Sequence, residues 1–160
     1  MMNVEPQPEH QWLHRLIGDW TCEFECDMGP DQPTKQTGMA SVRSLGGLWI
    51  INEGQGEVPG GGVSQSVLTI GYDPAKRTFR GTFIASVMTH LWIYDSGALD
   101  AAGKVLTLNA EGPSFSGEGM ANYQDIIEWI DDDHHTLSSR IQGPDGNWTH
   151  FMTGHYYRKQ

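Results

Sequence analysis

The residues Trp20-Thr21-Cys22-Glu23-Phe24-Glu25-Cys26-Asp27-Met28 alternate between apolar and polar side chains without interruption. Successive residues of a β-strand point to opposite faces of the sheet. The alternation therefore predicts a strand with one dry face and one wet face. The dry face carries Trp20, Cys22, Phe24, Cys26 and Met28, and the wet face carries Thr21, Glu23, Glu25 and Asp27.

A short helix is predicted directly before this strand, over residues 9–17. Its apolar residues recur at i,i+4 spacing, which stacks them on one side of a helix. Gly18 supplies the stop signal at its C-terminal end. Because one side of this helix must be covered, we expect it to lie on the open end of a barrel. The stacked pairs are Trp12/Leu16 and Leu13/Ile17.

The rest of the chain reads as further short extended segments separated by turns. They are predicted at Gln36–Leu45, Leu48–Glu57, Ser64–Tyr72, Arg77–Ser86, Met88–Ser96, Lys104–Glu111, Gly119–Trp129, His135–Gln142 and Asn147–Arg158. The connections are too short for the crossovers that parallel neighbours need, so sequential strands must pair antiparallel. We therefore predict an all-β fold, a closed up-and-down antiparallel β-barrel of about ten strands with a short N-terminal helix.

Length and charge narrow the classes of protein and partner. The 160 residues fit a single domain spanning 1–160. A net charge of −10 disfavours nucleic acid and anionic membrane surfaces, since both select for basic patches. No apolar stretch approaches the ~20 residues of a membrane span, and no secretory signal follows Met1. The expected location is the cytoplasm, with neither nucleic acid nor membrane as partner. The oligomeric state is left open, with a homodimer among the alternatives.

The two cysteines, Cys22 and Cys26, lie four residues apart on the same face of the first strand. Their α-carbons would be about 13 Å apart along a strand, whereas a disulfide tolerates no more than about 7 Å. We therefore expect two unpaired thiols that behave as small buried apolar groups.

Polar and aromatic side chains share single strand faces, as in a ligand-binding interior. His90, Trp92 and Tyr94 fall on one face of a strand, and Glu53 follows Trp49 on one face of another. Pockets are largely apolar with a few placed polar groups, whereas a barrel filled by its own side chains needs none. The predicted ligand-binding residues are Trp49, Glu53, Phe79, Phe83, His90, Trp92, Tyr94, Glu111, His150 and Met152.

Two family resemblances rest on particular residues. Gly18-x-Trp20 after a helical stub, the strand meander and Arg158 near the end of the chain resemble the calycin superfamily of lipocalins and fatty-acid-binding proteins. In that superfamily an Arg of the last strand packs across the first-strand Trp, so the resemblance implies a cation–π contact between Arg158 and Trp20.

The second resemblance covers nearly the whole chain and rests on the stretches 10–13, 18–20, 44–49, 71–74, 88–94 and 111–115. In these stretches the chain resembles the uncharacterised bacterial family catalogued as domain of unknown function 1579, and this resemblance implies a fold but no mechanism. The related haem-binding nitrobindins open with GxWxGxG, whereas here Trp20 is followed by Thr21-Cys22-Glu23, which disfavours haem.

Three functions follow from these residues. The first is binding of a small, largely apolar or aromatic ligand inside the barrel, with no cofactor. The alternative is a cofactor-free lyase, isomerase or hydrolase that uses His90 with Glu111 or Glu53 as acid and base. A second alternative is haem binding through His155 or His150. His90 could equally be an ordinary barrel histidine with Glu111 facing water, and Glu53 could mark where its strand face meets solvent.

No metal site is predicted. Asp131-Asp132-Asp133-His134-His135 has the composition of a metal cluster. Adjacent residues of a hairpin turn cannot converge on one ion, and a calcium loop needs spaced oxygen ligands around a glycine turn. Spacings typical of zinc sites, such as Cys-x-x-Cys, do not occur.

Overall fold

The computed structural model describes residues 4–26, 35–58 and 60–160, and within them it shows one helix and one antiparallel sheet of eleven strands. The helix is α1 (Pro8–His14). The strands are β1 (Gly18–Cys26), β2 (Lys35–Leu45), β3 (Trp49–Glu57), β4 (Val63–Asp73), β5 (Thr78–Ala85), β6 (Trp92–Tyr94), β7 (Ser96–Leu99), β8 (Val105–Pro113), β9 (Met120–Asp131), β10 (His134–Gln142) and β11 (Trp148–Arg158).

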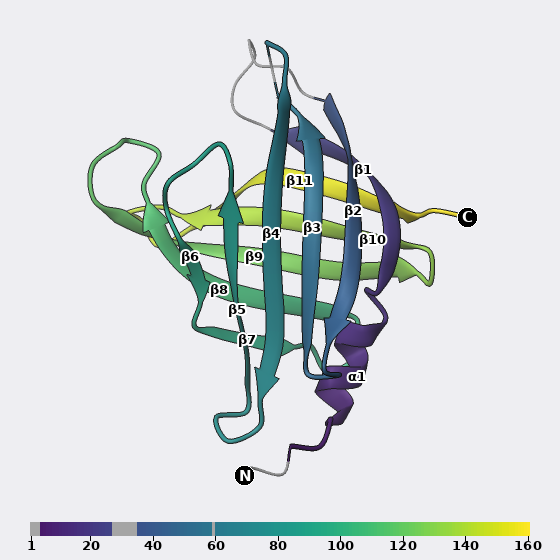
Figure 1. Cartoon of the computed structure of the whole chain (residues 1–160). Coiled ribbons are helices and arrows are strands. Elements are labelled where there is room, and N and C mark those ends of the chain that lie inside the picture. The colour runs from purple at the N-terminus through teal and green to yellow at the C-terminus, as the bar shows by residue number, and fades with distance from the viewer. Residues whose placement is uncertain (1–3, 27–34, 59) are drawn as a thin grey trace.

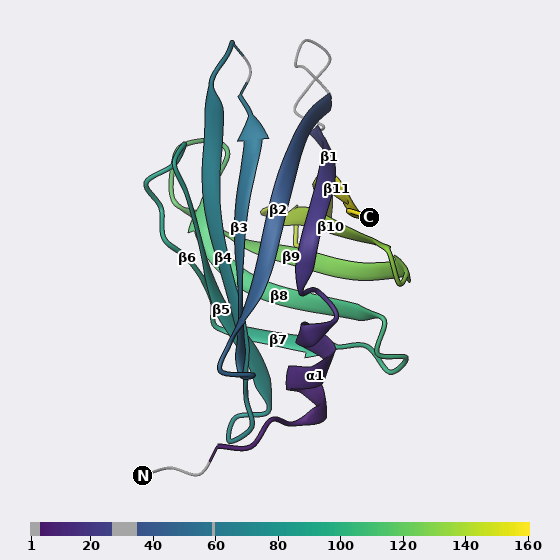
Figure 2. The same cartoon turned by 45° about the vertical axis from the view of Figure 1, so that its right-hand side comes forward.

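The sheet curls into a nearly closed barrel. The strand order is β6-β5-β4-β3-β2-β1-β11-β10-β9-β8-β7. Strands that follow each other in sequence are therefore paired, except β6 and β7, which form the two edges of the sheet, and β1 pairs with β11. Strands β2 to β5 cross β8 to β10 at a steep angle, and α1 lies at one end between the two groups (Figures 1 and 2). The predicted all-β antiparallel barrel with a short N-terminal helix is confirmed, with eleven strands in place of about ten.

One predicted strand, Met88–Ser96, is wrong as a single element. The chain forms the three-residue β6, which pairs with β5, and then the four-residue β7, which pairs with β8. The switch brings the two edges of the sheet together and so nearly closes the barrel. Where β5 and β7 meet, Thr78 bridges them through its hydroxyl: Gly97 N–H donates to Thr78 Oγ1 at 2.9 Å, and Thr78 Oγ1 donates to the Gly97 carbonyl at 3.2 Å.

The helix covers one end of the barrel. Trp12 and Leu13 of α1 and the following Leu16 are buried in the core. Trp12 Nε1 donates to the carbonyl of Gly103 at 2.7 Å, and ring nitrogens of His10 and His14 lie within hydrogen-bond distance of the carbonyls of Tyr72 and Gly47. The helix is shorter than the predicted 9–17, because residues 15–17 continue as a tighter turn with i→i−3 hydrogen bonds.

The parity predicted for the first strand is confirmed for its described residues, while Asp27 and Met28 lie outside them. Trp20 and Cys22 are buried, and Thr21, Glu23 and Glu25 are exposed. Both cysteines are free thiols, as expected.

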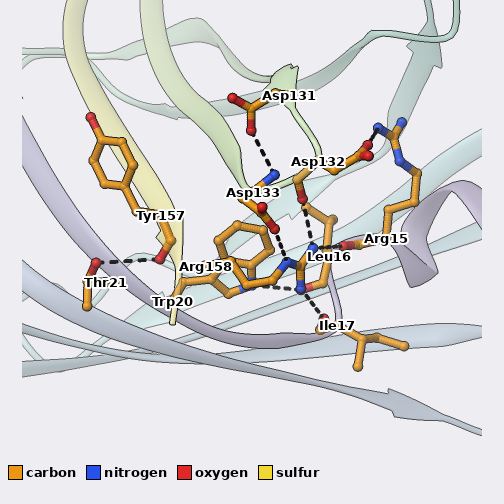
Figure 3. Close-up of polar contacts among 10 residues, drawn as sticks. All are labelled: Arg15, Leu16, Ile17, Trp20, Thr21, Asp131, Asp132, Asp133, Tyr157 and Arg158. Atoms are coloured by element: carbon orange, nitrogen blue, oxygen red, sulfur yellow. Dashed lines mark hydrogen bonds and ion pairs between the residues drawn. The ribbon is translucent and has the colours of Figure 1, made fainter. Parts of the chain in front are cut away.

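The cation–π contact expected between Arg158 of the last strand and Trp20 of the first strand is also present. The guanidinium carbon of Arg158 lies 4.2 Å from the centroid of the Trp20 ring. Figure 3 shows the same guanidinium donating to the backbone carbonyls of Ile17, Arg15 and Asp132 and to the Asp133 carboxylate. One side chain of the last strand thereby ties together the residues after α1, the start of β1 and the β9–β10 turn.

Candidate functional site

The barrel interior consists of a solid half and an open half. Near α1 many inward side chains are fully buried, among them Ile50, Ile70, Phe79, Leu106 and Leu108. Toward the other end Tyr123 is buried, but five other inward side chains of comparable size are only half-buried. These are Phe24, Phe83, Trp92, Leu137 and Met152. Solvent therefore reaches the interior from the end away from α1.

Aromatic side chains line one side of this opening. The Trp92 ring stands edge-on to His90, at 4.7 Å between centroids, and to Tyr123, at 4.8 Å. Phe115 and Phe151 extend the group, with ring centroids 6.0 and 6.1 Å from the centroid of the Tyr123 ring. Together these five residues form the aromatic mouth. Trp92 lies directly on the backbone of Gly112, where an added Cβ would be 2.3 Å from the indole, so glycine is required there.

An interior carboxyl group lies below the open half. Asp125 of β9 accepts a hydrogen bond from Ser139 Oγ of β10 at 2.5 Å and another from the phenol of Tyr94 of β6. Tyr94 and Ser139 are both buried, at 2% and 6% exposure. Burial raises the pKa of Asp125, and the two hydroxyl donors oppose that rise. Burial, reinforced by the neighbouring Asp125, also raises the pKa of Tyr94 well above its usual value. We call these three residues the interior polar cluster.

The interior thiol of Cys22 is expected to be unreactive as a nucleophile. Burial raises the pKa of Cys22 to about 12, despite a hydrogen bond with Tyr156. A thiol is nucleophilic only as the thiolate. Cys22 is therefore a packing residue, and its partner Tyr156 stacks flat on His135 at 4.8 Å between ring centroids.

A small cavity lies where the two halves meet, lined by Ile50 of the solid half and Leu137 of the open half. Its volume of about 10 Å³ is the room that one water-sized molecule needs. Asn52 and His135 are its polar lining residues, and neither the buried Asn52 Oδ1 nor the buried His135 Nδ1 has a hydrogen-bond partner in the described part of the protein. Burial lowers the pKa of His135 to about 3, so this imidazole is neutral around pH 7.

The predicted His90–Glu111 pair meets only through the backbone. His90 Nε2 lies 3.1 Å from the carbonyl oxygen of Glu111, so it is the protonated nitrogen that donates. The Glu111 residue is exposed, because on β8 the inward positions are its neighbours Ala110 and Gly112. The imidazole–carboxylate arrangement expected of an acid–base pair is absent at this position.

Trp49 and Glu53 face outward, which corrects their predicted interior placement. Glu53 is exposed and lies 3.5 Å from the Arg43 guanidinium, on the wall of an outer groove of about 410 Å³. Trp49 is 42% exposed. The inward face of β3 instead carries Ile50 and Asn52, opposite Ile70 and Leu68 of β4.

The remaining predicted residues divide between the two halves and the surface. Phe83, Trp92 and Met152 face the open half, Tyr94 belongs to the interior polar cluster, and Phe79 is solid core. His150 is exposed and within 2.9 Å of Thr153, since the β10–β11 register shifts at Ser139/Arg140 and breaks the parity of β11. His155 lies on the outer face beside His134, at 3.0 Å between ring nitrogens. Neither histidine suggested for haem faces the interior.

Sequence reasoning missed Asp125, Ser139 and Tyr123. A signal for Asp125 existed, because it is the one acidic residue in the alternating inward series Tyr123, Asp125, Ile127 and Trp129. Ser139 carried no such signal, since Ser138 beside it is equally polar.

The chain belongs to the family described as protein of unknown function DUF1579, whose model matches residues 5–158. No curated protein matches it. Its fold is similar to the crystal structure of Rv2717c from M. tuberculosis, with a TM-score of 0.65 and 13% identity over 98% of this chain and 100% of that one.

Designed barrels are also similar. EF1p2_mFAP2b, described as bound to DFHBI, gives a TM-score of 0.50 and 12% identity over 94% of this chain and 98% of that one. A de novo designed fluorescence-activating β-barrel gives a TM-score of 0.49 and 14% identity over 91% of this chain and 95% of that one. At such identities the likeness concerns the fold.

Two absences hold for the residues that the structure describes. Among them, no helix is long and apolar enough to cross a membrane. Across residues 4–26, 35–58 and 60–160, no three His, Cys, Asp or Glu side chains are grouped so that they could hold a metal ion.

Proposed function

We propose that the protein binds a small, largely apolar or aromatic molecule in the open half of its barrel. The observation that carries the proposal is the difference in side-chain burial between the two halves of the barrel interior. One half is filled with buried side chains, whereas in the other half Phe24, Phe83 and Met152 face inward and are only half-buried. Covering that apolar surface with a ligand would contribute roughly 25 cal/mol per Å² removed from water.

The chemistry around this space matches a small-molecule site. Such sites are mostly apolar and aromatic, with a few polar groups that fix the orientation of the ligand. Here the aromatic mouth supplies flat apolar surface at the entrance. The interior polar cluster supplies hydrogen-bonding groups below it. A ligand in this position would lie with its apolar part against Trp92 and Phe83 and its polar end toward Asp125.

A designed barrel of similar fold, EF1p2_mFAP2b, is described with a small molecule bound. This likeness supports the proposal for the fold alone, because the identity is 12%. Binding is favoured over the acid–base alternative because His90 meets only the backbone of Glu111, and Glu53 is on the outer surface.

The test uses a neutral aromatic probe, N-phenyl-1-naphthylamine, whose fluorescence rises in apolar surroundings. We expect saturable binding by the wild type at one molecule per chain. Trp92→Ala removes a wall of the open half and should weaken binding by at least about tenfold, the cost of a buried aromatic contact. The control is Trp148→Ala, an indole on the outer surface under Arg140, which should bind as the wild type does.

Native mass spectrometry of gently purified protein provides a second measurement, because a resident ligand appears as added mass. Absence of saturable probe binding together with a mass equal to that of the bare chain would overturn the proposal. Equal weakening by Trp92→Ala and Trp148→Ala would place the probe outside the barrel.

A further inference from the structure

Among the described residues, no cationic side chain pairs with the Asp125 carboxyl group inside the barrel. Its two oxygens each receive one hydroxyl, from Ser139 and from Tyr94. The ion pairs among the described residues are Arg15–Asp132, Arg43–Glu53 and Arg158–Asp133, and none involves Asp125. Buried charges in proteins are normally paired with an opposite charge. Asp125 therefore departs from that rule within the described part of the chain.

The surroundings of the Asp125 carboxyl group affect its ionisation in two opposite ways. Two O–H donors aimed at two carboxyl oxygens are the arrangement that an ionised carboxylate requires. An ionised carboxylate offers about four acceptor positions, so two hydroxyls leave capacity for a further donor. Burial opposes the charge and raises the pKa of the group. A nearby positive charge would resolve this conflict in favour of the carboxylate.

Within residues 4–26, 35–58 and 60–160, the groups that surround Asp125 supply no such positive charge. Opposite Asp125 on its two neighbouring strands stand Leu108 of β8 and Ser139 of β10. Beyond Ser139 lies Met152 of β11, which is half-buried and borders the open half. The titratable side chains that approach from other strands are the phenols of Tyr94 and Tyr156. These neighbours are uncharged around pH 7.

Asp125 keeps some solvent-accessible surface on the inner side of the barrel. Its strand is paired on both sides, yet the residue remains half-buried instead of fully buried. Protein atoms therefore do not cover it completely. At the level of the whole molecule, the net charge of −10 raises the local concentration of cations, which favours encounter with a positively charged ligand.

From these observations we infer that the ligand of this barrel carries a protonated nitrogen, as in an aromatic amine cation, and that this nitrogen pairs with the Asp125 carboxylate. The inference rests on the proposed function, since it names the class of ligand for the same interior site. The ammonium group would donate to the acceptor positions that Tyr94 and Ser139 leave free. The aromatic part would extend from Asp125 toward Trp92.

The experiment compares two probes by isothermal titration calorimetry at pH 7. They are 1-naphthylmethylamine and 1-naphthylmethanol, which share one ring system and differ in a single group, a protonated amine in the first and a neutral hydroxyl in the second. The wild type should bind the amine at least about tenfold more tightly than the alcohol, as a charge-assisted hydrogen bond predicts. Asp125→Asn, which has the same shape, should lose this preference, so that the amine and the alcohol bind to the variant with similar affinities. The control Asp95→Asn changes an exposed carboxylate and should keep the preference.

The outcomes separate the two proposals. If both probes bind equally well to the wild type, or the alcohol binds better, the inference is overturned while ligand binding stands. If neither probe binds, the proposed function fails and the inference fails with it. The wild-type comparison decides by itself should Asp125→Asn prove unfolded by circular dichroism. A preference for the amine that survives Asp125→Asn would also overturn the assignment to Asp125.

Discussion

Gly18 and Arg158 approach each other so closely that no side chain fits between them. A Cβ added at Gly18 would lie 2.9 Å from Nη1 of Arg158, and the Gly18 backbone has a φ of +134°. That φ belongs to a region that residues with a Cβ rarely adopt. The glycine thus lets the chain turn from α1 into β1 while the guanidinium of the last strand reaches the carbonyl of Ile17.

Gly18→Ala should therefore cost stability for two separate reasons. The backbone conformation alone costs of order 1–3 kcal/mol for a residue with a Cβ. Displacing Arg158 adds the loss of its hydrogen bonds. We expect the free energy of unfolding, measured by urea denaturation, to fall by about 2–4 kcal/mol. The control Gly146→Ala also has positive φ, at 84°, but meets open space, so it should cost less. Equal losses would mean that the Arg158 contact contributes nothing.

Arg158→Ala tests the same junction from the other side. The substitution removes a cation–π contact and hydrogen bonds to three carbonyls, so we expect a loss of about 1–3 kcal/mol in the free energy of unfolding. Lys159→Ala, one residue further and exposed, should stay within about ±0.5 kcal/mol. Trp20→Ala should exceed both, since loss of a buried Trp costs roughly 3–5 kcal/mol. Similar sensitivity at positions 158 and 159 in urea melts would contradict the assigned contact.

Apolar–polar alternation along the sequence predicts strands well. It identifies the face that points into the barrel only where one face is clearly apolar. In β1 the choice is plain, because Glu23 and Glu25 cannot face a core. In β3 both faces mix apolar and polar residues, and the pairing of Ile50 with Ile70 decides. That pairing is a long-range contact that no local pattern contains. The predicted interior Glu53 was wrong for this reason.

Local sequence patterns also could not predict the features that depend on how the strands pair around the barrel. The segment 88–96 reads as one strand, yet in the barrel the chain changes pairing partner here, from β5 at β6 to β8 at β7. His150 leaves the inner face because of a register shift between β10 and β11. Asp125 could have been found, since an acidic residue in an apolar alternation is costly to bury and therefore informative. Its partners Tyr94 and Ser139 come from other strands, and only the structure brings them together.

The buried His135 makes the stability of the fold depend on pH. Burial, assisted by the charges of His134 and Arg158, lowers the pKa of His135 from 6.5 to about 3 in the folded chain. Between these two values the unfolded chain binds the proton and the folded chain does not. Stability should therefore fall as the pH drops from 6.5 toward 3, by at most about 1.4 kcal/mol per pH unit.

His135→Phe, which retains a ring to stack on Tyr156, should flatten this dependence in urea melts between pH 4 and 7. Asp125 acts in the opposite sense, because its pKa is raised and its contribution declines as the pH rises above 3.8. The informative quantity is thus the difference in slope between wild type and variant. His150→Gln, a change to an exposed imidazole, should retain the wild-type slope. An unchanged slope in His135→Phe would show that folding does not lower the pKa of His135.

Asn52→Leu should stabilise the protein. The two side chains have nearly the same shape, and the buried Asn52 Oδ1 has no hydrogen-bond partner in the described part of the protein. Leucine would remove that uncompensated polar atom and add apolar contact with Ile50 and Leu68 in the enclosed cavity. We expect the free energy of unfolding to rise by about 0.5–2 kcal/mol in urea melts. Asn122→Leu, which changes an exposed amide, should bring no gain. A loss of about 1 kcal/mol or more on Asn52→Leu would instead show that a water molecule bound in the cavity satisfies the amide, because removing that hydrogen bond is then costly.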